Sequence, residues 1–359
     1  MDVAHYTELS LTAQTAYAQL FEAALAAEHL RSVADLSGSF AAKTVKGHKY
    51  WYFQYTEPSG KLRQIFVGPE GDAVRQLMNR KVLAGGMQSV EPLARSALAL
   101  GCAGLLPRHF RVLRRLADYG FFRAGGVLIG THAFLAYGNM LGVRWGEAER
   151  TQDLDFAHAG KSVALLLPSN LEINLGDAIE SLNMGFLPIT ALASPYSATF
   201  LNPKEPDFRL DFLTTLHRGG EETFVHPQLR IALQPLRFME FSLEDVQQAA
   251  MIGTNGAVIA NVPHPARYAL HKLLVFGERI GSYATKSRKD LVQAAQLIAY
   301  LSQHRPDDLD AAWKDLMGRG RQWVARARQG LTALAASAPE LKVSERLRVP
   351  VVRRIAKRS

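Results

Sequence analysis

Two short segments that alternate carboxylates with large apolar residues constrain the fold of this chain more than any other feature. The first segment, DLDF, covers residues 153–156, and the second, RLDFL, covers residues 209–213. In a β-strand, successive side chains point to opposite faces, so each segment places its acids on one face and its Leu and Phe residues on the other. The pattern predicts neighbouring strands with an apolar face and an acidic face that carries Asp153, Asp155 and Asp211.

Carboxylates held side by side repel one another unless a hard cation neutralises them, and Mg²⁺ prefers oxygen ligands. A third acid on a neighbouring strand would complete a cage for two metal ions. A D-x-D sequence is common, however, and an ordinary solvated pair is the alternative interpretation of Asp153 and Asp155. The segments around the motif therefore decide between the two.

Upstream of the motif, a strand predicted at 124–129 ends at Gly130-Thr131, and helical periodicity runs from His132 to residue 141. Small residues with free amides at a helix N-terminus bind phosphate readily. No Gly-Lys-Ser/Thr follows, so a P-loop is not expected. His132, Asp153 and His158 lack the spacing of a zinc site, which disfavours that metal.

This order of elements resembles the nucleotidyltransferase superfamily of the DNA polymerase β type. The sequence TQDLD at 151–155 is similar to the T-x-D-[ILV]-D pattern of a bacterial branch that includes the AbiEii-like toxins of toxin–antitoxin systems. The whole arrangement most resembles bacterial proteins described only as having a nucleotidyltransferase fold. Where the superfamily usually has Gly-Ser or Gly-Gly, this chain has Gly130-Thr131, which keeps the hydroxyl and amide but adds a methyl group.

The resemblance implies an α+β fold with a polymerase β-like core, a mixed sheet with flanking helices. It further implies that Asp153 and Asp155 hold one Mg²⁺ and that Asp155 and Asp211 hold a second, with Mn²⁺ as an alternative. Asp211 is then the best candidate for the proton acceptor. Gly130 and Thr131 are expected to hold phosphate oxygens of a nucleoside triphosphate.

The resemblance extends to HKLL at 271–274 and KSRKDL at 286–291, so the matched region covers about 123–299. It implies that Lys272 neutralises charge on the triphosphate and that Asp290 contributes to nucleotide binding. Without it, Lys272 would be an ordinary solvated lysine on an amphipathic helix, and 288–290 would be capping and surface charge.

Four segments are predicted along the chain. Residues 1–104 form an N-terminal accessory module with a helix, an aromatic β-hairpin at 43–68 and a further helix. Residues 105–240 form the catalytic core, 241–340 a mainly helical domain, and 341–359 a basic tail. The aromatics at 50–55 either stack on nucleic acid bases or form a small sheet core, and the second alternative is favoured.

The 359 residues carry a formal charge of +9, because 42 Lys and Arg outnumber 33 Asp and Glu, and this favours polyanionic partners. Expected partners are a nucleoside triphosphate and a hydroxyl acceptor, which is RNA, for example tRNA, or a protein; an antitoxin is a further candidate. A nucleic-acid-binding module without activity and an antibiotic-modifying enzyme are the alternatives. No membrane segment or signal peptide is evident, so a cytoplasmic protein is expected, and the lone Cys102 is expected to be buried and inert.

Overall fold

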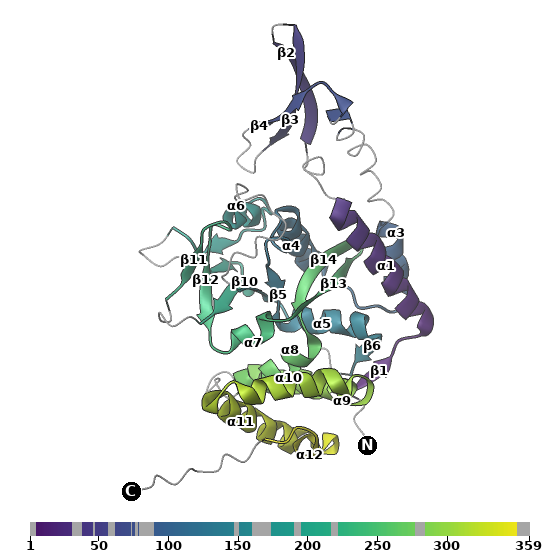
Figure 1. Ribbon diagram of the computed structural model, residues 1–359, viewed down its shortest axis with the longest axis vertical. Coiled ribbons are helices and arrows are strands. Elements are labelled where there is room, and N and C mark those ends of the chain that lie inside the picture. The colour runs from purple at the N-terminus through teal and green to yellow at the C-terminus, as the bar shows by residue number, and fades with distance from the viewer. Residues whose placement is uncertain are drawn as a thin grey trace.

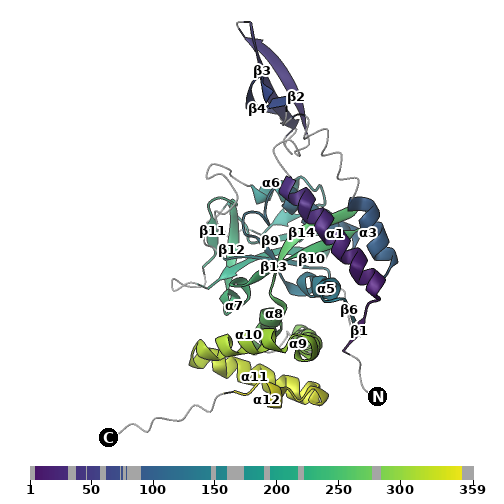
Figure 2. The same cartoon turned by 45° about the vertical axis from the view of Figure 1, so that its right-hand side comes forward.

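The computed structural model describes residues 5–30, 38–45, 47–56, 62–72, 74–75, 78, 90–146, 151–159, 174–189, 195–216, 222–276 and 284–349. A central mixed sheet occupies the middle of the molecule, with a small three-stranded sheet beyond one end and a layer of helices beyond the other (Figures 1 and 2). No helix in these ranges is both long enough and apolar enough to cross a membrane.

The central sheet has seven strands, ordered β11-β12-β10-β7-β5, with β9 also paired to β10 and β8 to β9. The strands are β5 (Val127–Leu128), β7 (Leu154–His158), β8 (Leu187–Pro188), β9 (Thr199–Asn202), β10 (Glu205–Thr215), β11 (Phe224–His226) and β12 (Ile231–Leu236). β10 is parallel to β7 and β12, whereas β5 and β9 are antiparallel to their neighbours. The sheet is therefore mixed, as the resemblance implies.

One face of β7 and β10 is buried in the main core. Leu154 and Leu210 are fully buried, and the rings of Phe156 and Phe212 stack with their centroids 5.2 Å apart. Burying such side chains contributes about 1.5–3 kcal/mol each. Because residues on a strand alternate between faces, this packing directs Asp155 and Asp211 to the opposite face.

Among the described elements, the short helix α7 (Met239–Leu243) packs on part of that opposite face. Met239 and Leu243 pack with Val127, Ile129 and Ala157 in a small cluster of their own. Three further helices flank the sheet: α4 (Pro107–Asp118), α5 (Gly130–Leu141) and α6 (Leu175–Glu180). Asp155 and Asp211 lie on this same face of the sheet.

The C-terminal part is a layer of helices. Its elements are α8 (Pro265–Phe276), α9 (Ala284–His304), α10 (Pro306–Gly318), α11 (Arg321–Ser337), the 3₁₀ helix η3 (Pro339–Leu341) and α12 (Val343–Arg346). Within the segment 341–359, predicted as a basic tail, Leu341 ends η3 and 343–346 form α12, and residues 350–359 lie outside the described ranges.

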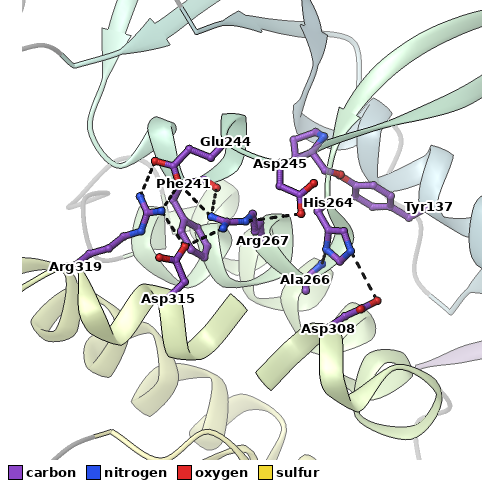
Figure 3. Close-up of polar contacts among 11 residues, drawn as sticks. Tyr137, Phe241, Glu244, Asp245, His264, Ala266, Arg267, Asp308, Asp315 and Arg319 are labelled. Atoms are coloured by element: carbon purple, nitrogen blue, oxygen red, sulfur yellow. Dashed lines mark hydrogen bonds and ion pairs between the residues drawn. The ribbon is translucent and has the colours of Figure 1, made fainter. Parts of the chain in front are cut away.

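A cluster of charges joins these helices to α7 (Figure 3). Asp315 of α10 accepts from Arg267 of α8 at 2.9 Å and from Arg319 at 2.8 Å. Arg319 also binds Glu244, which follows α7. Both guanidinium groups lie over the buried ring of Phe241, 4.8 and 5.0 Å from its centroid. The cluster holds the helical layer against the sheet domain.

This cluster predicts a pH-dependent contribution to stability. Burial raises the pKa of the Asp315 carboxyl, but hydrogen bonding and charge from Arg319 and Arg267 outweigh burial and lower the pKa below its ordinary value. A carboxyl of this kind stabilises the folded protein above its unfolded pKa of about 3.9, and the stabilisation is lost as the pH falls through the folded pKa.

We expect Asp315→Asn to lower the free energy of unfolding at pH 7 by at most about 1 kcal/mol, because 36% of the side chain is exposed and solvent screens the pair. Urea unfolding of both proteins across a pH series measures the difference. The gap should close well below pH 4, and a gap that is independent of pH would contradict this role.

The first hundred residues share a core with a later hairpin. Helices α1 (Leu11–Leu30) and α3 (Val90–Ala99) pack on β13 (Val246–Gly253) and β14 (Gly256–Pro263). A two-stranded sheet of β1 (Tyr6–Glu8) and β6 (Val143–Trp145) adds a further link. Cys102 is buried in this cluster as an unpaired thiol, as predicted. The helical expectation for residues just after 241 is wrong, because β13 is a strand.

The three-stranded sheet consists of β2 (Gly38–Val45), β3 (His48–Thr56) and β4 (Leu62–Pro69), so the predicted hairpin has a third strand. Phe53 is fully buried, and its ring contacts Phe40. On the other face, Lys43 lies 4.8 Å over the ring of Tyr52, and Phe66 is 56% exposed. The small-core alternative therefore holds for Phe53, and the opposite face keeps exposed aromatic surface.

Candidate active site

Two of the predicted acids occupy paired positions on adjacent parallel strands. Asp155 of β7 is in register with Asp211 of β10, as Leu154 is with Leu210. Neighbouring strands lie about 4.8 Å apart, so the two carboxylates project side by side from the same face. Both side chains are partly exposed. The predicted pairing of acids across neighbouring strands is therefore present for Asp155 and Asp211.

The carboxylate of Asp211 is oriented by two neighbours that sequence reasoning did not identify. Its Oδ1 accepts a hydrogen bond from Thr199 Oγ1 at 2.8 Å, and its Oδ2 pairs with Arg209 Nε at 2.9 Å. Thr199 reaches it because β9 pairs with β10 at this position. Each carboxylate oxygen can accept a further bond, so both remain able to bind a cation or a hydroxyl.

Asp155 lies against the start of helix α5. Gly130, the first residue of that helix, has a φ of +63°, in the left-handed region that favours glycine. A Cβ built on Gly130 would overlap Oδ2 of Asp155. Glycine is therefore required here for two reasons, its backbone conformation and the close approach of the carboxylate. The predicted phosphate-binding turn and the predicted acid are brought into direct contact.

Two residues from the C-terminal helices support this turn from behind. The Tyr268 hydroxyl is 2.8 Å from Gly130 O and 2.9 Å from Gln293 Oε1. Gln293 Nε2 in turn lies 3.5 Å from Thr131 Oγ1. Tyr268 is on α8 and Gln293 on α9, so these helices fix the position of the Gly-Thr turn. Neither residue has a sequence motif that could have identified it.

The predicted pair Lys272 and Asp290 lies next to this support. Lys272 Nζ is 2.7 Å from Asp290 Oδ1 and 5.0 Å from the ring centre of Tyr268. Their side chains are only 13% and 4% exposed, which makes this a largely buried ion pair. The structure thus brings Lys272 and Asp290 together and places them one helical turn from Tyr268 and Gln293.

Asp153 lies immediately before β7 rather than on it. Its Oδ1 accepts a hydrogen bond from the Thr151 hydroxyl of the same loop. Among the described residues, no three His, Cys, Asp or Glu side chains converge closely enough to hold a metal ion by themselves. The two-residue spacing therefore does not bring Asp153 into one three-acid cage with Asp155 and Asp211 in this structure.

A buried histidine pair lies near Asp153. His132 Nε2 and His109 Nδ1 are 2.9 Å apart, and both residues are 2% exposed. Burial, with a contribution from Arg108, lowers the pKa of His109 to about 4, and burial lowers the pKa of His132 to about 3, while the Asp153 charge opposes both shifts. Both rings are neutral at pH 7. The ring of His158 lies against that of His226, with the centroids 4.5 Å apart.

Comparison with known proteins identifies a family for this chain. The family model described as nucleotidyltransferase matches residues 108–318, which spans the site and more than half of the chain. A solved structure of an antigenic nucleotidyltransferase-like protein from Paracoccidioides brasiliensis is 14% identical, with 69% of this chain and 96% of that chain covered and a TM-score of 0.33. No curated protein matches the sequence significantly.

Proposed function

Because the chain belongs to the nucleotidyltransferase family, we propose that it transfers a nucleotidyl group from a nucleoside triphosphate to a hydroxyl acceptor with the help of Mg²⁺. The observation that carries this proposal is the contact between Asp155, paired with Asp211, and the Gly130 turn that opens α5. Carboxylates that can bind a cation thus lie next to backbone amides that can bind a phosphate. Phosphoryl transfer requires both kinds of group close together.

The residues at this position fit Mg²⁺. Asp155 and Asp211 offer only oxygen donors, and Mg²⁺ is usually held by one or two carboxylates together with water and substrate phosphates. Asp155 and Asp211 would hold one ion, and Asp153 with Asp155 a second, with Mn²⁺ as an alternative. Bound there, the metal would supply charge neutralisation for the triphosphate.

The Gly130-Thr131 turn would hold phosphate oxygens. The first amides of a helix have no partner within the helix, and its N-terminus carries partial positive charge. Lys272 would contribute a second positive charge next to this turn. In this structure its ammonium is bound by Asp290, so we propose that Lys272 exchanges part of that pairing for the triphosphate, with Asp290 keeping the side chain in place.

The proposed reaction is a substitution at phosphorus. The acceptor hydroxyl oxygen forms a bond to the α-phosphorus, the bond from that phosphorus to the bridging oxygen of the β-phosphate breaks, and pyrophosphate leaves. Asp211 accepts the hydroxyl proton through an oxygen whose second lone pair is free of Thr199 and Arg209. The neutral His109 and His132 add no charge of their own beside Asp153.

The acceptor is proposed to be RNA or a protein, with antitoxin regulation as in the AbiEii-like toxins. One experiment separates these classes from the alternatives. The protein is incubated with Mg²⁺ and α-labelled nucleoside triphosphates together with an RNA pool, lysate proteins or aminoglycosides. Label in RNA or in protein supports the proposal, label in aminoglycosides indicates an antibiotic-modifying enzyme, and no label in any pool contradicts transfer and favours a binding module.

Removing the Tyr268 hydroxyl, which supports the Gly130-Thr131 turn, is expected to lower activity without a large loss of stability. Tyr268→Phe removes only the hydroxyl that links Gly130 O to Gln293, so the turn loses about 1 kcal/mol of hydrogen bonding and some of its fixed position. We expect transfer to fall about tenfold. Tyr300→Phe is the matched control, because its hydroxyl bonds Leu141 O at the far end of α5. Equal activities in both variants would contradict the positioning role.

A further inference from the structure

A pocket of about 250 Å³ that does not include Asp153, Asp155 or Asp211 lies between helix α4 and the turn that joins β13 to β14. Its walls are formed by Pro107, Phe110, Arg111, Arg114, Arg115, Asp118, Thr254 and Asn255. α4 lies beside β14 in Figure 1, on the side of the sheet domain that faces the three-stranded sheet. Nothing in the proposed reaction uses this pocket.

Three arginines dominate the lining. They come from successive turns of one helix, so their guanidinium groups gather on one side of α4. Arg111 donates to the Leu182 carbonyl, and Arg114 lies 5.3 Å over the ring of Phe110, so both are positioned by neighbours that carry no charge. Arg114 Nη2 also lies 2.9 Å from where a Cβ of Gly256 would be, which places it at the hairpin turn.

These arginines differ from the other clustered arginines in their ion pairs. Arg267 and Arg319 share Glu244 and Asp315, and Arg209 pairs with Asp211. Within the described ranges, by contrast, no ion pair joins Arg111, Arg114 or Arg115 to an acidic side chain. Asp118 is the one acid in the pocket wall, so the lining holds three positive charges against one negative charge. Like charges held together repel one another, and a bound anion relieves the part of that repulsion that Asp118 does not offset. The pocket is therefore suited to a further anion.

The same helix connects the pocket to the proposed active site. Arg108, one turn before Arg111, binds Gln152, the neighbour of Asp153, and also Glu205 at the start of β10. A helix rises 1.5 Å per residue, so Arg115 is about 10 Å further along the axis than Arg108. A ligand that filled the pocket and reached the aspartates would have to be extended and carry its negative charge at a distance from its reactive end.

We propose that the Arg111, Arg114 and Arg115 pocket binds a backbone phosphate of a single-stranded nucleic acid whose terminal hydroxyl is the acceptor, an inference that rests on the proposed function. A nucleic acid strand has phosphates at regular intervals and a hydroxyl at its end, which matches a remote anion pocket and a separate reactive site. Guanidinium groups bind phosphate oxygens in pairs, which suits arginine better than lysine. The formal charge of +9 favours the same class of ligand.

The test is binding of fluorescent single-stranded RNA and DNA oligonucleotides of one sequence, measured by anisotropy at several salt concentrations. We compare the full-length protein with R111Q/R114Q/R115Q. Loss of the contact with this phosphate should weaken binding at least about tenfold near 0.1 M salt and reduce the slope of log affinity against log salt by about 0.7. R321Q/R326Q/R328Q on α11 removes the same charge elsewhere and should retain both values. If the pocket variant unfolds, Arg111→Gln alone, at an exposed position, should lower both the affinity and the slope in the same direction by a smaller amount.

Unchanged affinity and slope in the pocket variants would overturn the inference, as would equal losses in the α11 control. Displacement by polyglutamate but not by either oligonucleotide would also overturn it and indicate an acidic protein instead. The inference holds for either kind of nucleic acid. Pocket-dependent binding of the RNA or of the DNA oligonucleotide therefore supports it. If binding depends on the pocket but no oligonucleotide receives label from a triphosphate, the proposed function fails while the nucleic acid site stands.

Discussion

Asp155→Asn is expected to reduce nucleotidyl transfer at least about 1000-fold, which corresponds to about 4 kcal/mol of transition-state stabilisation. The amide keeps the shape of the side chain but removes the charge at the position where β7, β10 and the start of α5 meet. Removing that charge leaves Asp211 as the single carboxylate of the in-register pair. Initial rates with α-labelled triphosphate measure the loss.

Asp207→Asn is the matched control, because Asp207 is an exposed acid on the same strand as Asp211 but outside the site. Its rate should stay within about twofold of the unaltered protein. Circular dichroism and thermal unfolding of both variants check the fold. Retention of more than a tenth of the activity by Asp155→Asn would contradict the placement of Asp155 at the metal.

Gly130→Ala is expected to abolish transfer as well, for a geometric reason. The new methyl group would occupy the space of Asp155 Oδ2, so the carboxylate must move away from the amides of α5. The left-handed φ of +63° adds about 1–2 kcal/mol of backbone strain. We expect a loss of activity of at least about 100-fold, together with a lower unfolding temperature.

Gly47→Ala separates the two causes. Gly47 also has a positive φ, +80°, but a Cβ there meets nothing within 4 Å. It should therefore show the backbone strain as reduced stability while transfer stays near its original rate. Similar activity in Gly130→Ala and Gly47→Ala would mean that the contact between Gly130 and Asp155 has no role in transfer.

The strands of the site could be predicted from sequence because each has one buried and one accessible face. β7 and β10 alternate acids with Leu and Phe, and the alternation predicted both strands and the shared face of Asp155 and Asp211. β13 could not be predicted in this way. Its second half is buried on both faces, so the residues from Ala249 onward form a continuous apolar run without a two-residue period.

The residues that support the Gly130-Thr131 turn could not be predicted from sequence, for a different reason. Tyr268 and Gln293 act on Gly130 and Thr131 from helices more than a hundred residues later, and no spacing rule relates such distant positions. Lys272 and Asp290 were predicted as separate nucleotide-binding residues, and only the packing of α8 on α9 makes them a pair. Asp153 lies outside β7 because the strand begins at Leu154.

The division of the chain into 1–104, 105–240, 241–340 and 341–359 stays a prediction, and the packing gives it a physical context. α1 and α3, from the first segment, form one core with β13 and β14 of the third. A hairpin that is apolar on both faces needs such a cover, and composition along the chain does not reveal which helices provide it.

The most direct test of the central claim follows the α- and γ-phosphates of one nucleoside triphosphate with two different labels. The protein, Mg²⁺ and the acceptor pools are incubated, and acceptor and small-molecule products are separated. Nucleotidyl transfer predicts the α-label in the acceptor, the γ-label in pyrophosphate, and neither product with Asp211→Asn. The γ-label in the acceptor, or transfer that survives Asp211→Asn unchanged, would contradict the account.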